Sequence, residues 1–271
     1  MFADLHLHSI FSDSTRSPEN IVEIAKDKKV SLISICDHYT IASFERLADA
    51  CKSSDVAYVS GIEMDANLRG ENYHILAYNF DVTNQKLLDF IKRQSLKNQK
   101  DCEAMIVKMC NDYPQLSLSD YMKFDYPKDL GGWKYAHYAA ERGIFESYEE
   151  AIKMIFPTYF KAGEETYSVD EFCRIVKQAN GIPVLAHPGE LDSENLTALL
   201  RDMQESGIEG VECYYPSHSK RTTETCLDYC RKNNMRITSG SDCHGDYDRT
   251  DGFSIGSLQI SIDMLDLRGI V

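Results

Sequence analysis

Short runs rich in β-branched and aromatic residues alternate with helical patterns along most of the chain. The runs that predict strands span residues 2–7, 30–36, 56–62, 73–80, 182–186, 208–213 and 236–239. The first helix is predicted to begin at Pro18 with Ser17 as its N-cap, because serine accepts backbone hydrogen bonds there and proline suits a first turn. Alternation of strands and helices at this spacing predicts a mostly parallel sheet or barrel, and hence an α/β fold.

Residues 81–165 depart from this alternation. They are rich in Lys and Glu, their apolar residues follow a helical pattern, and that pattern is interrupted near Tyr113-Pro114 and at residues 129–132. We therefore interpret residues 81–165 as a helical insertion into a unit that is built from residues 1–80 and 166–271.

The composition is that of an ordinary globular protein, with 43% hydrophobic and 27% charged residues in a chain of 271. The net charge of −14 argues against binding of long duplex nucleic acid or anionic membranes, which needs a basic surface. A small anionic ligand stays possible, because bound cations can reverse the sign of the charge inside a cleft. The nine cysteines include no CxxC pair, and no apolar run suits a signal peptide or a membrane span. These features predict a cytoplasmic protein with reduced thiols.

Imidazoles and carboxylates gather at the ends of the predicted strands. Those at or just past a strand end are His6, His8, Asp37, His38, Glu63, His187, Asp242 and His244, while Glu212 lies within a strand and His74 near the start of one. In a parallel barrel the carboxyl ends of the strands meet on one face, so these side chains are expected to lie close together. Burying such groups without partners is expensive, and divalent cations remove that cost. Imidazole suits zinc, iron or manganese, and the added carboxylates favour a site for several ions.

Two other histidines are less informative. His137, beside Tyr135 and Tyr138 in the insertion, is expected to have a structural role, while His218, in a loop after a strand, suits a structural role and a functional one equally. No glycine-rich phosphate loop occurs, and no serine or cysteine stands out as a nucleophile. Water activated by a metal ion is therefore the expected attacking group.

Six short segments occur in an order that resembles a known family. They are DLHLHS (4–9), CDH (36–38), GIE (61–63), YHILAY (73–78), LAHPG (185–189) and SDCHG (241–245). They resemble the motifs of the polymerase-and-histidinol-phosphatase (PHP) superfamily of metal-dependent phosphoesterases. The chain is similar to the stand-alone bacterial branch with a helical insertion, whose members hydrolyse nucleotide 3′,5′-bisphosphates or trim short RNA from the 5′ end. The resemblance implies a distorted (β/α)7 barrel with two or three divalent ions (Mn, Fe or Zn), capped over the substrate by the insertion.

The family pattern divides the candidate ligands into three groups. By resemblance, a first ion would be held by His6, His8, Glu63 and Asp242, a second by Glu63, His74 and His187, and a third by Asp13, His38 and His244. Glu63 would thus bridge two ions and keep them close enough for in-line attack on phosphorus by a hydroxide held between them. The resemblance therefore implies catalytic roles for Glu63 and Asp242.

The resemblance also implies supporting and substrate-binding residues. Asp37 and Glu212 are expected to orient the ligands, and His218 is expected to donate to phosphate or to protonate the leaving alcohol. The insertion departs from the family pattern, because Gly132-Trp133-Lys134 stands where relatives carry an Arg-Pro-His element whose Arg contacts substrate phosphate. Lys134 is the expected replacement for that Arg, as a point charge.

Two further residues have open interpretations. Trp133, the single tryptophan of the chain, suits stacking on a nucleobase and packing within the insertion equally. Arg16 lies three residues after Asp13, in a segment where relatives usually have glycine after the aspartate. It is a candidate phosphate contact, although a solvated surface arginine is the more common outcome.

We therefore predict a metal-dependent phosphoesterase that acts on a small phosphorylated substrate, such as a nucleotide bisphosphate or a short oligonucleotide, without an obligate protein partner. Three alternatives stay open: a histidinol-phosphate-type phosphatase, a metal-dependent amidohydrolase, and a member of the fold that binds without catalysis. Such amidohydrolases usually place a lysine between two ions, whereas Glu63 takes that place here. Non-catalytic members lose ligands, and none of the expected ligands is missing from this sequence.

Overall fold

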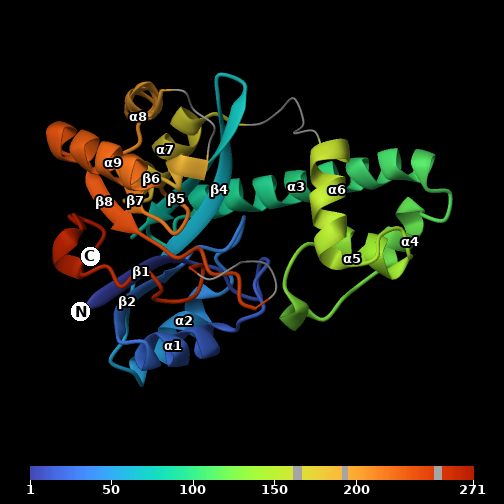
Figure 1. Ribbon diagram of the computed structural model, residues 1–271, viewed down its shortest axis with the longest axis horizontal. Helices are drawn as coiled ribbons and strands as arrows, with labels where there is room; N and C mark the ends of the chain where they lie inside the picture. Colours follow the sequence, from blue (N-terminus) through green and yellow to red (C-terminus); the bar gives the residue numbers. More distant parts are fainter. Residues whose placement is uncertain (161–166, 191–194, 247–251) are drawn as a thin grey trace.

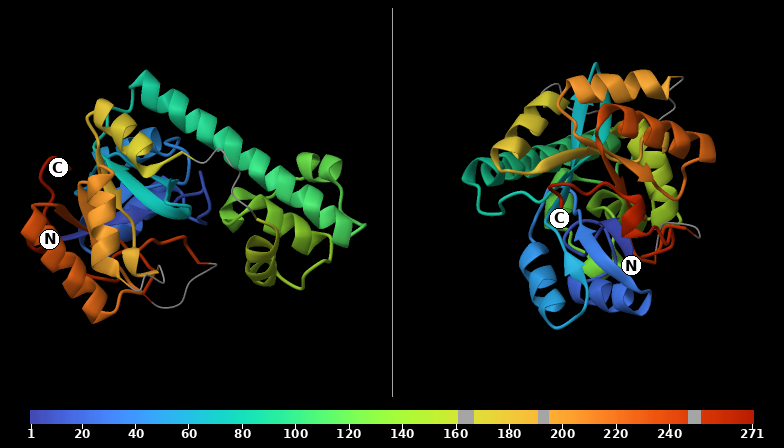
Figure 2. Two further views of the ribbon diagram at one scale, coloured as in Figure 1. Left: turned by 90° about the horizontal axis from the view of Figure 1, so that it is seen from above. Right: turned by 90° about the vertical axis from the view of Figure 1, so that its left-hand side faces the viewer.

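The computed structural model describes residues 1–160, 167–190, 195–246 and 252–271. Its strands are β1 (Phe2–Leu7), β2 (Val30–Ile35), β3 (Ala57–Tyr58), β4 (Gly61–Leu68), β5 (Glu71–Tyr78), β6 (Ile182–Leu185), β7 (Gly210–Tyr214) and β8 (Arg236–Ser239). Its α-helices are α1 (Pro18–Asp27), α2 (Phe44–Lys52), α3 (Gln85–Asp112), α4 (Leu118–Lys123), α5 (Lys134–Glu141), α6 (Tyr148–Tyr159), α7 (Val169–Gln178), α8 (Leu196–Glu205) and α9 (Lys220–Asn233). The strands and most helices form one body, from which α3 extends toward α4, α5 and α6 (Figure 1). Both chain ends lie on the body, at the side away from those helices (Figure 2).

The strands form two sheets, of order β1-β2-β3 and β4-β5-β6-β7-β8. Pairing is parallel within the first sheet and between β6, β7 and β8, as the alternation of strands and helices predicts. In contrast, β5 runs antiparallel to both of its neighbours, β4 and β6. The single strand expected at residues 56–62 is divided between two strands, because the chain leaves the first sheet after the short β3 and enters the second with β4.

The two sheets approach each other at two seams. At one seam, the amide of Asp242, just past β8, donates to the carbonyl of His6 in β1 (2.7 Å). At the other, a parallel bridge joins His38, just past β2, to Glu63 in β4. The mixed α/β class is as predicted, whereas the distorted (β/α)7 barrel that the resemblance implies is not confirmed, because the described ladders form two separate sheets. Both seams carry residues of the predicted site.

The predicted start of α1 is confirmed. The Ser17 hydroxyl accepts a hydrogen bond from the amide of Asn20, and Pro18 takes the first helical position. The helix then buries Ile21 and Ala25, four residues apart, on the face that meets the sheet.

The insertion is built on α3, a single helix of 28 residues. Its first half buries Leu87 and Phe90 in the main core of the body, and its second half buries Met105 and Met109 in a separate core with α4, α5 and α6. The interruption predicted near Tyr113-Pro114 is the end of α3, and the one predicted at residues 129–132 separates α4 from α5. One continuous helix therefore belongs to both units.

Two further observations concern the chain as a whole. No helix within the described ranges is long and apolar enough to cross a lipid bilayer. All nine cysteines are free thiols, and eight of them are buried.

Candidate metal centre and active site

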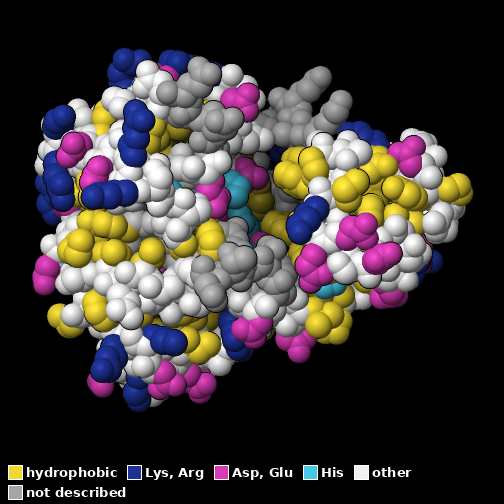
Figure 3. Space-filling model, in the orientation of Figure 1, with side chains coloured by type: hydrophobic (Ala, Val, Ile, Leu, Met, Phe, Trp, Pro, Cys, Tyr) yellow, Lys and Arg dark blue, Asp and Glu magenta, His cyan; other side chains and the backbone are white. Residues whose placement is uncertain are grey.

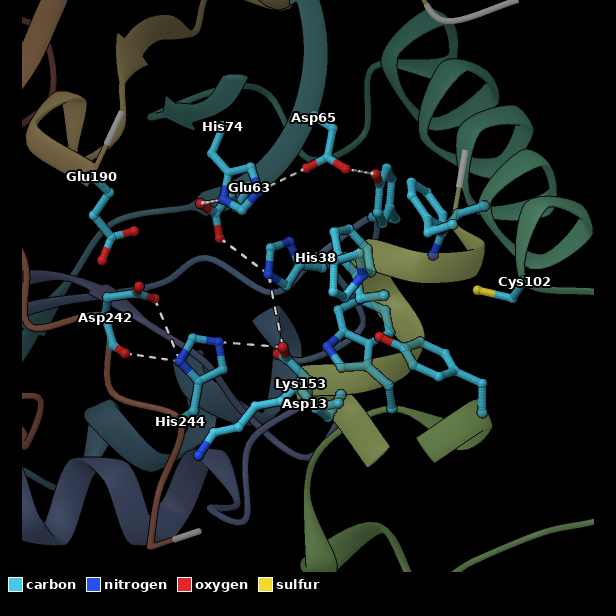
Figure 4. A pocket seen from close by; sticks show the side chains of 18 of the residues that line it. Asp13, His38, Glu63, Asp65, His74, Cys102, Lys153, Glu190, Asp242 and His244 are labelled. Atoms are coloured by element: carbon cyan, nitrogen blue, oxygen red, sulfur yellow. Dashed lines mark hydrogen bonds and ion pairs between the residues drawn. The ribbon is translucent and has the colours of Figure 1, made fainter. Parts of the chain in front are cut away.

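The polar side chains at the strand ends converge on the floor of one cavity (Figure 4). Three groups of potential ligand atoms form there, and within each group these atoms lie within 4.8 Å of one another. The groups are His6, His8, Glu63 and Asp242; Glu63, His74 and His187; and His8, Asp13, His38 and His244. The structure thus brings together every residue that was predicted as a metal ligand, with His8 as an additional member of the third group.

His74 reaches this cluster from the first half of a strand, not from its end. Because β5 runs antiparallel to β6, its first half lies at the edge of the sheet where β6 ends, and Ile75 pairs there with Leu185. His74 precedes Ile75, and His187 comes just after β6, so their rings lie 5.1 Å apart between centroids. The antiparallel direction of β5 therefore explains why His74 lies in the first half of its strand, whereas the neighbouring candidate ligands lie at or after the ends of theirs.

Glu63 lies at the centre of the cluster, with only 1% of its surface exposed. Its Oε2 lies 3.1 Å from His8 Nε2, 3.2 Å from His6 Nε2 and 3.4 Å from His38 Nε2, and its Oε1 lies 2.8 Å from His74 Nδ1 and 3.3 Å from His187 Nε2. The two oxygens of one carboxylate thus face different groups of imidazoles, which is the arrangement expected of a bridging ligand.

Glu212, predicted as a supporting residue, forms hydrogen bonds with His6 and His187. Its carboxylate accepts hydrogen bonds from His6 Nδ1 (3.2 Å) and from the backbone amide of His187 (3.0 Å). Because Nδ1 of His6 is occupied in this way, Nε2 of that ring is left to face the cluster.

Asp37, the other predicted supporting residue, holds a loop. It accepts hydrogen bonds from the amide and the hydroxyl of Ser9 and from the hydroxyl of Ser12, each at 2.7 Å. The loop that these bonds fix leads to Asp13, whose Oδ2 lies 3.3 Å from His244 Nε2. Asp37 therefore positions a candidate ligand through the backbone.

Three residues at the site have a left-handed backbone that is uncommon outside glycine: Tyr39 (φ 56°), His187 (φ 26°) and Asp242 (φ 52°). Such conformations cost about 1–3 kcal/mol each and persist only where the surroundings fix them. The amide of Tyr39 donates to the carbonyl of Glu63 (3.2 Å), and the amides of the other two residues are bonded as described above. These conformations therefore lower the stability of the fold, and they set the directions in which the three side chains point.

The chemistry of the cluster fits divalent cations. Glu63 Oε2, His8 Nδ1 and His38 Nδ1 are buried and make no hydrogen bond within the described part of the chain. Buried polar atoms of this kind are costly unless a cation binds the group. Imidazole nitrogen combined with carboxylate oxygen is a donor set that zinc, iron and manganese accept.

Without cations, opposing effects govern the protonation of these histidines. Burial lowers the pKa of His74, but the carboxylates of Glu63 and Asp65 outweigh burial and raise this pKa from 6.5 to about 10. Surrounding carboxylates raise the pKa of His6 against burial in the same way, whereas burial dominates at His38 and lowers its pKa.

Metal affinity is therefore expected to rise with pH. A cation must displace the proton of His74, and the neutral form of a group with a pKa of about 10 becomes about tenfold rarer for each pH unit below that value. Calorimetric titration with Zn²⁺ or Mn²⁺ from about pH 6 to about pH 8.5, in buffers of different ionisation enthalpy, measures both the affinity and the protons released. An affinity that is the same across this range would contradict the expectation.

The insertion supplies the opposite wall of the cavity, whose volume is about 370 Å³. Histidine and acidic side chains are visible at the bottom of the cleft between the body and the insertion (Figure 3). The aromatic side chains of the insertion wall are Trp133, Tyr135, Tyr148, Phe156 and Phe160. The Trp133 ring lies 5.6 Å from the His38 ring between centroids, so the aromatic wall reaches the metal floor.

The structure places two of the expected phosphate contacts elsewhere. Lys134 does not line the cavity, since its ammonium lies 4.7 Å from the centre of the Tyr121 ring within the insertion. Arg16 forms an ion pair with Asp246 and does not line the cavity either. Among the described residues, Lys153 of α6 is the one lysine or arginine that does so.

His218 also lies outside the cavity lining. Its Nε2 accepts a hydrogen bond from the amide of Gly189 (3.0 Å), so its Nδ1 carries the proton and donates to the carbonyl of Cys213 (3.1 Å). With both ring nitrogens bonded to the backbone, His218 is not placed to donate to phosphate or to a leaving alcohol. It instead holds the turn that follows His187.

Three residues at the site, Asp65, Glu190 and Tyr215, were not predicted from the sequence, and the first two line the cavity. Asp65 lies beside His74, and the hydroxyl of Tyr215 lies 2.8 Å from Asp242 Oδ2 and 2.9 Å from Glu190 Oε1. Asp65 could have been found, because it follows Glu63 by two positions and so projects from the same side of the strand. Tyr215 directly follows β7, so its place at a strand end was a usable signal, whereas Glu190 belongs to a short 3-10 helix (Pro188–Glu190) that no local pattern predicts.

Most of the chain matches a known protein family. A family model of the PHP domain matches residues 4–249. The chain belongs to the PHP family. This PHP protein is a metal-dependent phosphoesterase, in keeping with the ligand groups and with the names of its relatives.

Its relatives cleave different phosphate esters. It is 25% identical to a 5′-3′ exoribonuclease of Haemophilus influenzae over 89% of each chain. It is 25% identical to the phosphoribosyl 1,2-cyclic phosphate 1,2-diphosphodiesterase of Eggerthella lenta, over 92% of this chain and 96% of that protein. It is 23% identical to the 3′,5′-nucleoside bisphosphate phosphatase of Chromobacterium violaceum, over 89% of this chain and 86% of that protein.

Solved structures support the fold. A metal-dependent phosphoesterase of Bifidobacterium adolescentis superposes with a TM-score of 0.82 at 23% identity, covering 99% of this PHP protein and 94% of that chain. An amidohydrolase of Chromobacterium violaceum with bound sulfate superposes with a TM-score of 0.78 at 20% identity, covering 91% and 89%.

Proposed function

We propose that this PHP protein hydrolyses a phosphate ester of a small molecule, such as a nucleotide bisphosphate or the end of a short oligonucleotide, with two or three ions of Mn, Fe or Zn. The observation that carries the proposal is the sharing of Glu63 between two ligand groups on the floor of a single cavity. Shared ligands hold cations close together, and closely spaced cations suit displacement at phosphorus because they stabilise both the attacking and the leaving oxygen.

The insertion wall supports a small substrate with an aromatic part. Trp133 and Phe156 line the insertion side of the cavity beside the acidic floor, so a nucleobase would have rings to stack on while its phosphate meets the floor. A cavity of about 370 Å³ is in the range of small-molecule sites. Its lining offers too few lysine and arginine side chains to bind the phosphates of a long nucleic acid strand. On this proposal residues 81–165 act as a cap over the substrate.

Bound cations would supply charge stabilisation at phosphorus and a more acidic water molecule. The residues of the chain would hold the cations, orient the ligands and bind the substrate. Glu63 and Asp242 would hold the cations, Glu212 keeps the ring of His6 turned toward them, and Lys153 would pair with a phosphate that lies nearer the insertion. The aromatic wall would exclude bulk water from the floor.

A panel of phosphate esters tests the proposal. Protein stripped with a chelator and reloaded with Mn²⁺, Fe²⁺ or Zn²⁺ is assayed on p-nitrophenyl phosphate, nucleoside monophosphates and 3′,5′-bisphosphates, short 5′-phosphorylated RNA, and histidinol phosphate. Elemental analysis of the same samples counts the ions per chain. Amides and lactones belong in the panel too, because turnover of these without release of phosphate would overturn the proposal.

Lys153→Ala is expected to raise KM for phosphorylated substrates about 10–100-fold with a smaller effect on kcat. A charged hydrogen bond to phosphate contributes about 1.5–3 kcal/mol, and a contact made equally in the ground state and the transition state affects KM alone. Lys134→Ala is the matched control, because that ammonium lies over Tyr121 and away from the cavity. If both variants showed the KM of the parent protein, Lys153 would have no part in substrate binding.

A further inference from the structure

The β4–β5 hairpin sets Asp65 directly opposite His74. Arg69 and Gly70 form its two-residue turn, and both have positive φ (55° and 96°), as a type I′ turn requires. A two-residue turn fixes the register of the whole antiparallel ladder, and in this register Asp65 pairs with His74. A slip of one residue would turn one of these side chains to the other face of the hairpin.

The two nitrogens of the His74 ring therefore face different carboxylates. Nδ1 lies 2.8 Å from Glu63 Oε1, within the ligand cluster, and Nε2 lies 3.1 Å from Asp65 Oδ1, on the opposite side of the ring. The remaining oxygen of Asp65 accepts a hydrogen bond from the Tyr39 hydroxyl (2.5 Å). Both oxygens of Asp65 are thus committed, one to the ring and one to the phenol (Figure 4).

Tyr39 is held firmly in this position. Its backbone has the left-handed conformation noted above, and its amide donates to the carbonyl of Glu63 (3.2 Å). A strained residue tied to the strand that carries both carboxylates is consistent with a requirement for its hydroxyl at this point.

We propose that Asp65 is a positioning residue that fixes the tautomer of His74, an inference that rests on the proposed metal-dependent function. Asp65 accepts the proton-bearing Nε2–H, so the lone pair of Nδ1 points into the group formed by Glu63, His74 and His187. Tyr39 fixes Asp65 in turn. Glu212 plays the same part for His6 through the other ring nitrogen, so the two rings face Glu63 in opposite tautomers.

Metal-binding measurements test this inference without reference to activity. The parent protein, D65A, D65N and D101N are dialysed against Zn²⁺ at a series of buffered free concentrations, and the ions per chain are counted. D65A is expected to bind one ion about 10–100-fold more weakly, with the other ions unaffected. D65N is expected to recover most of that affinity, because the amide oxygen can still accept from Nε2–H.

D101N is the matched control. Asp101 lines a second, smaller pocket together with Tyr39 and Asp65, and it pairs with Lys97 (2.6 Å) on α3, without contact to a histidine ring among the described residues. It removes a negative charge of the same kind, so an equal loss of affinity in D101N and D65A would mean that charge alone matters and would overturn the inference.

Nitrogen-15 spectra of histidine-labelled, Zn²⁺-loaded protein report the tautomer itself. The His74 signal, assigned by its absence from H74Q, is expected to show the proton on Nε2 in the parent protein. A proton on Nδ1, or a D65A isotherm identical to that of the parent protein, would overturn the inference. A parent protein that binds no ion would instead overturn the proposed function, so the two failures are distinguishable.

Discussion

Substitution of Glu63 by glutamine is expected to lower kcat for phosphate esters by about a thousandfold or more, because the variant loses the charge that is shared between two groups of ligands. Glutamine keeps the volume of the side chain, but its NH2 group meets an imidazole where a carboxylate oxygen now lies. Steady-state assays on p-nitrophenyl phosphate measure the loss, and elemental analysis is expected to show fewer ions per chain. The far-ultraviolet circular dichroism spectrum is expected to stay unchanged.

Glu71→Gln is the control for this experiment. Glu71 begins β5 on the same hairpin, but its side chain is exposed to solvent. It is expected to keep the turnover and the metal content of the parent protein. Near-normal turnover in Glu63→Gln, with metal content intact, would contradict the bridging role of Glu63.

Substitution of Glu212 by glutamine is expected to weaken metal binding about 10–100-fold although Glu212 belongs to none of the ligand groups. Its two oxygens accept from the ring of His6 and from the amide of His187, both of which are donors. The amide of glutamine offers only one acceptor, so one buried donor loses its partner. Competition with a chromophoric chelator measures the affinity, and thermal unfolding of the metal-free protein is expected to show a loss of about 1–3 kcal/mol.

Glu209→Gln provides the comparison. Glu209 lies just before β7, forms ion pairs with Lys177 and Arg236, and is 30% exposed. Exposed pairs of this kind contribute about 0–1 kcal/mol, so this variant is expected to keep its metal affinity and nearly all of its stability. Equal metal affinity in the two glutamine variants would mean that Glu212 does not orient His6.

The candidate ligands could be predicted from the sequence because of where they lie relative to the strands. His38, His187 and Asp242 each follow a predicted strand, and parallel strands bring their carboxyl ends together whatever their order in the sheet. His74 did not fit that rule, and only the family resemblance included it. The reason is the direction of β5, since the β4–β5 hairpin depends on a turn at Arg69-Gly70 that is a weak signal compared with Asn-Gly.

The insertion wall was harder to predict than the floor. Trp133 and Lys134 are neighbours, yet the first lines the cavity and the second packs over Tyr121, because successive residues of a chain point in different directions. No motif of the family resemblance pointed to Lys153, whereas the position of Lys134 matched a family element. The pattern in α6 was nevertheless present, because Tyr148, Ile152 and Phe156 recur every four residues on one face of that helix, and Phe160 comes just after its end. Which surface that face would meet depends on helix packing, which no local pattern predicts.

The unbroken passage of α3 through both cores has a consequence for substrate length. An α-helix advances about 1.5 Å and turns about 100° with each residue. Adding seven residues, almost two full turns, within α3 would carry the aromatic wall about 10.5 Å outward with almost the same orientation, whereas one or two extra residues would rotate it out of alignment. The distance between the aromatic wall and the metal floor can therefore change only in steps of whole helical turns. Such an insertion in α3 would admit a longer substrate while the residues of the floor stay in place.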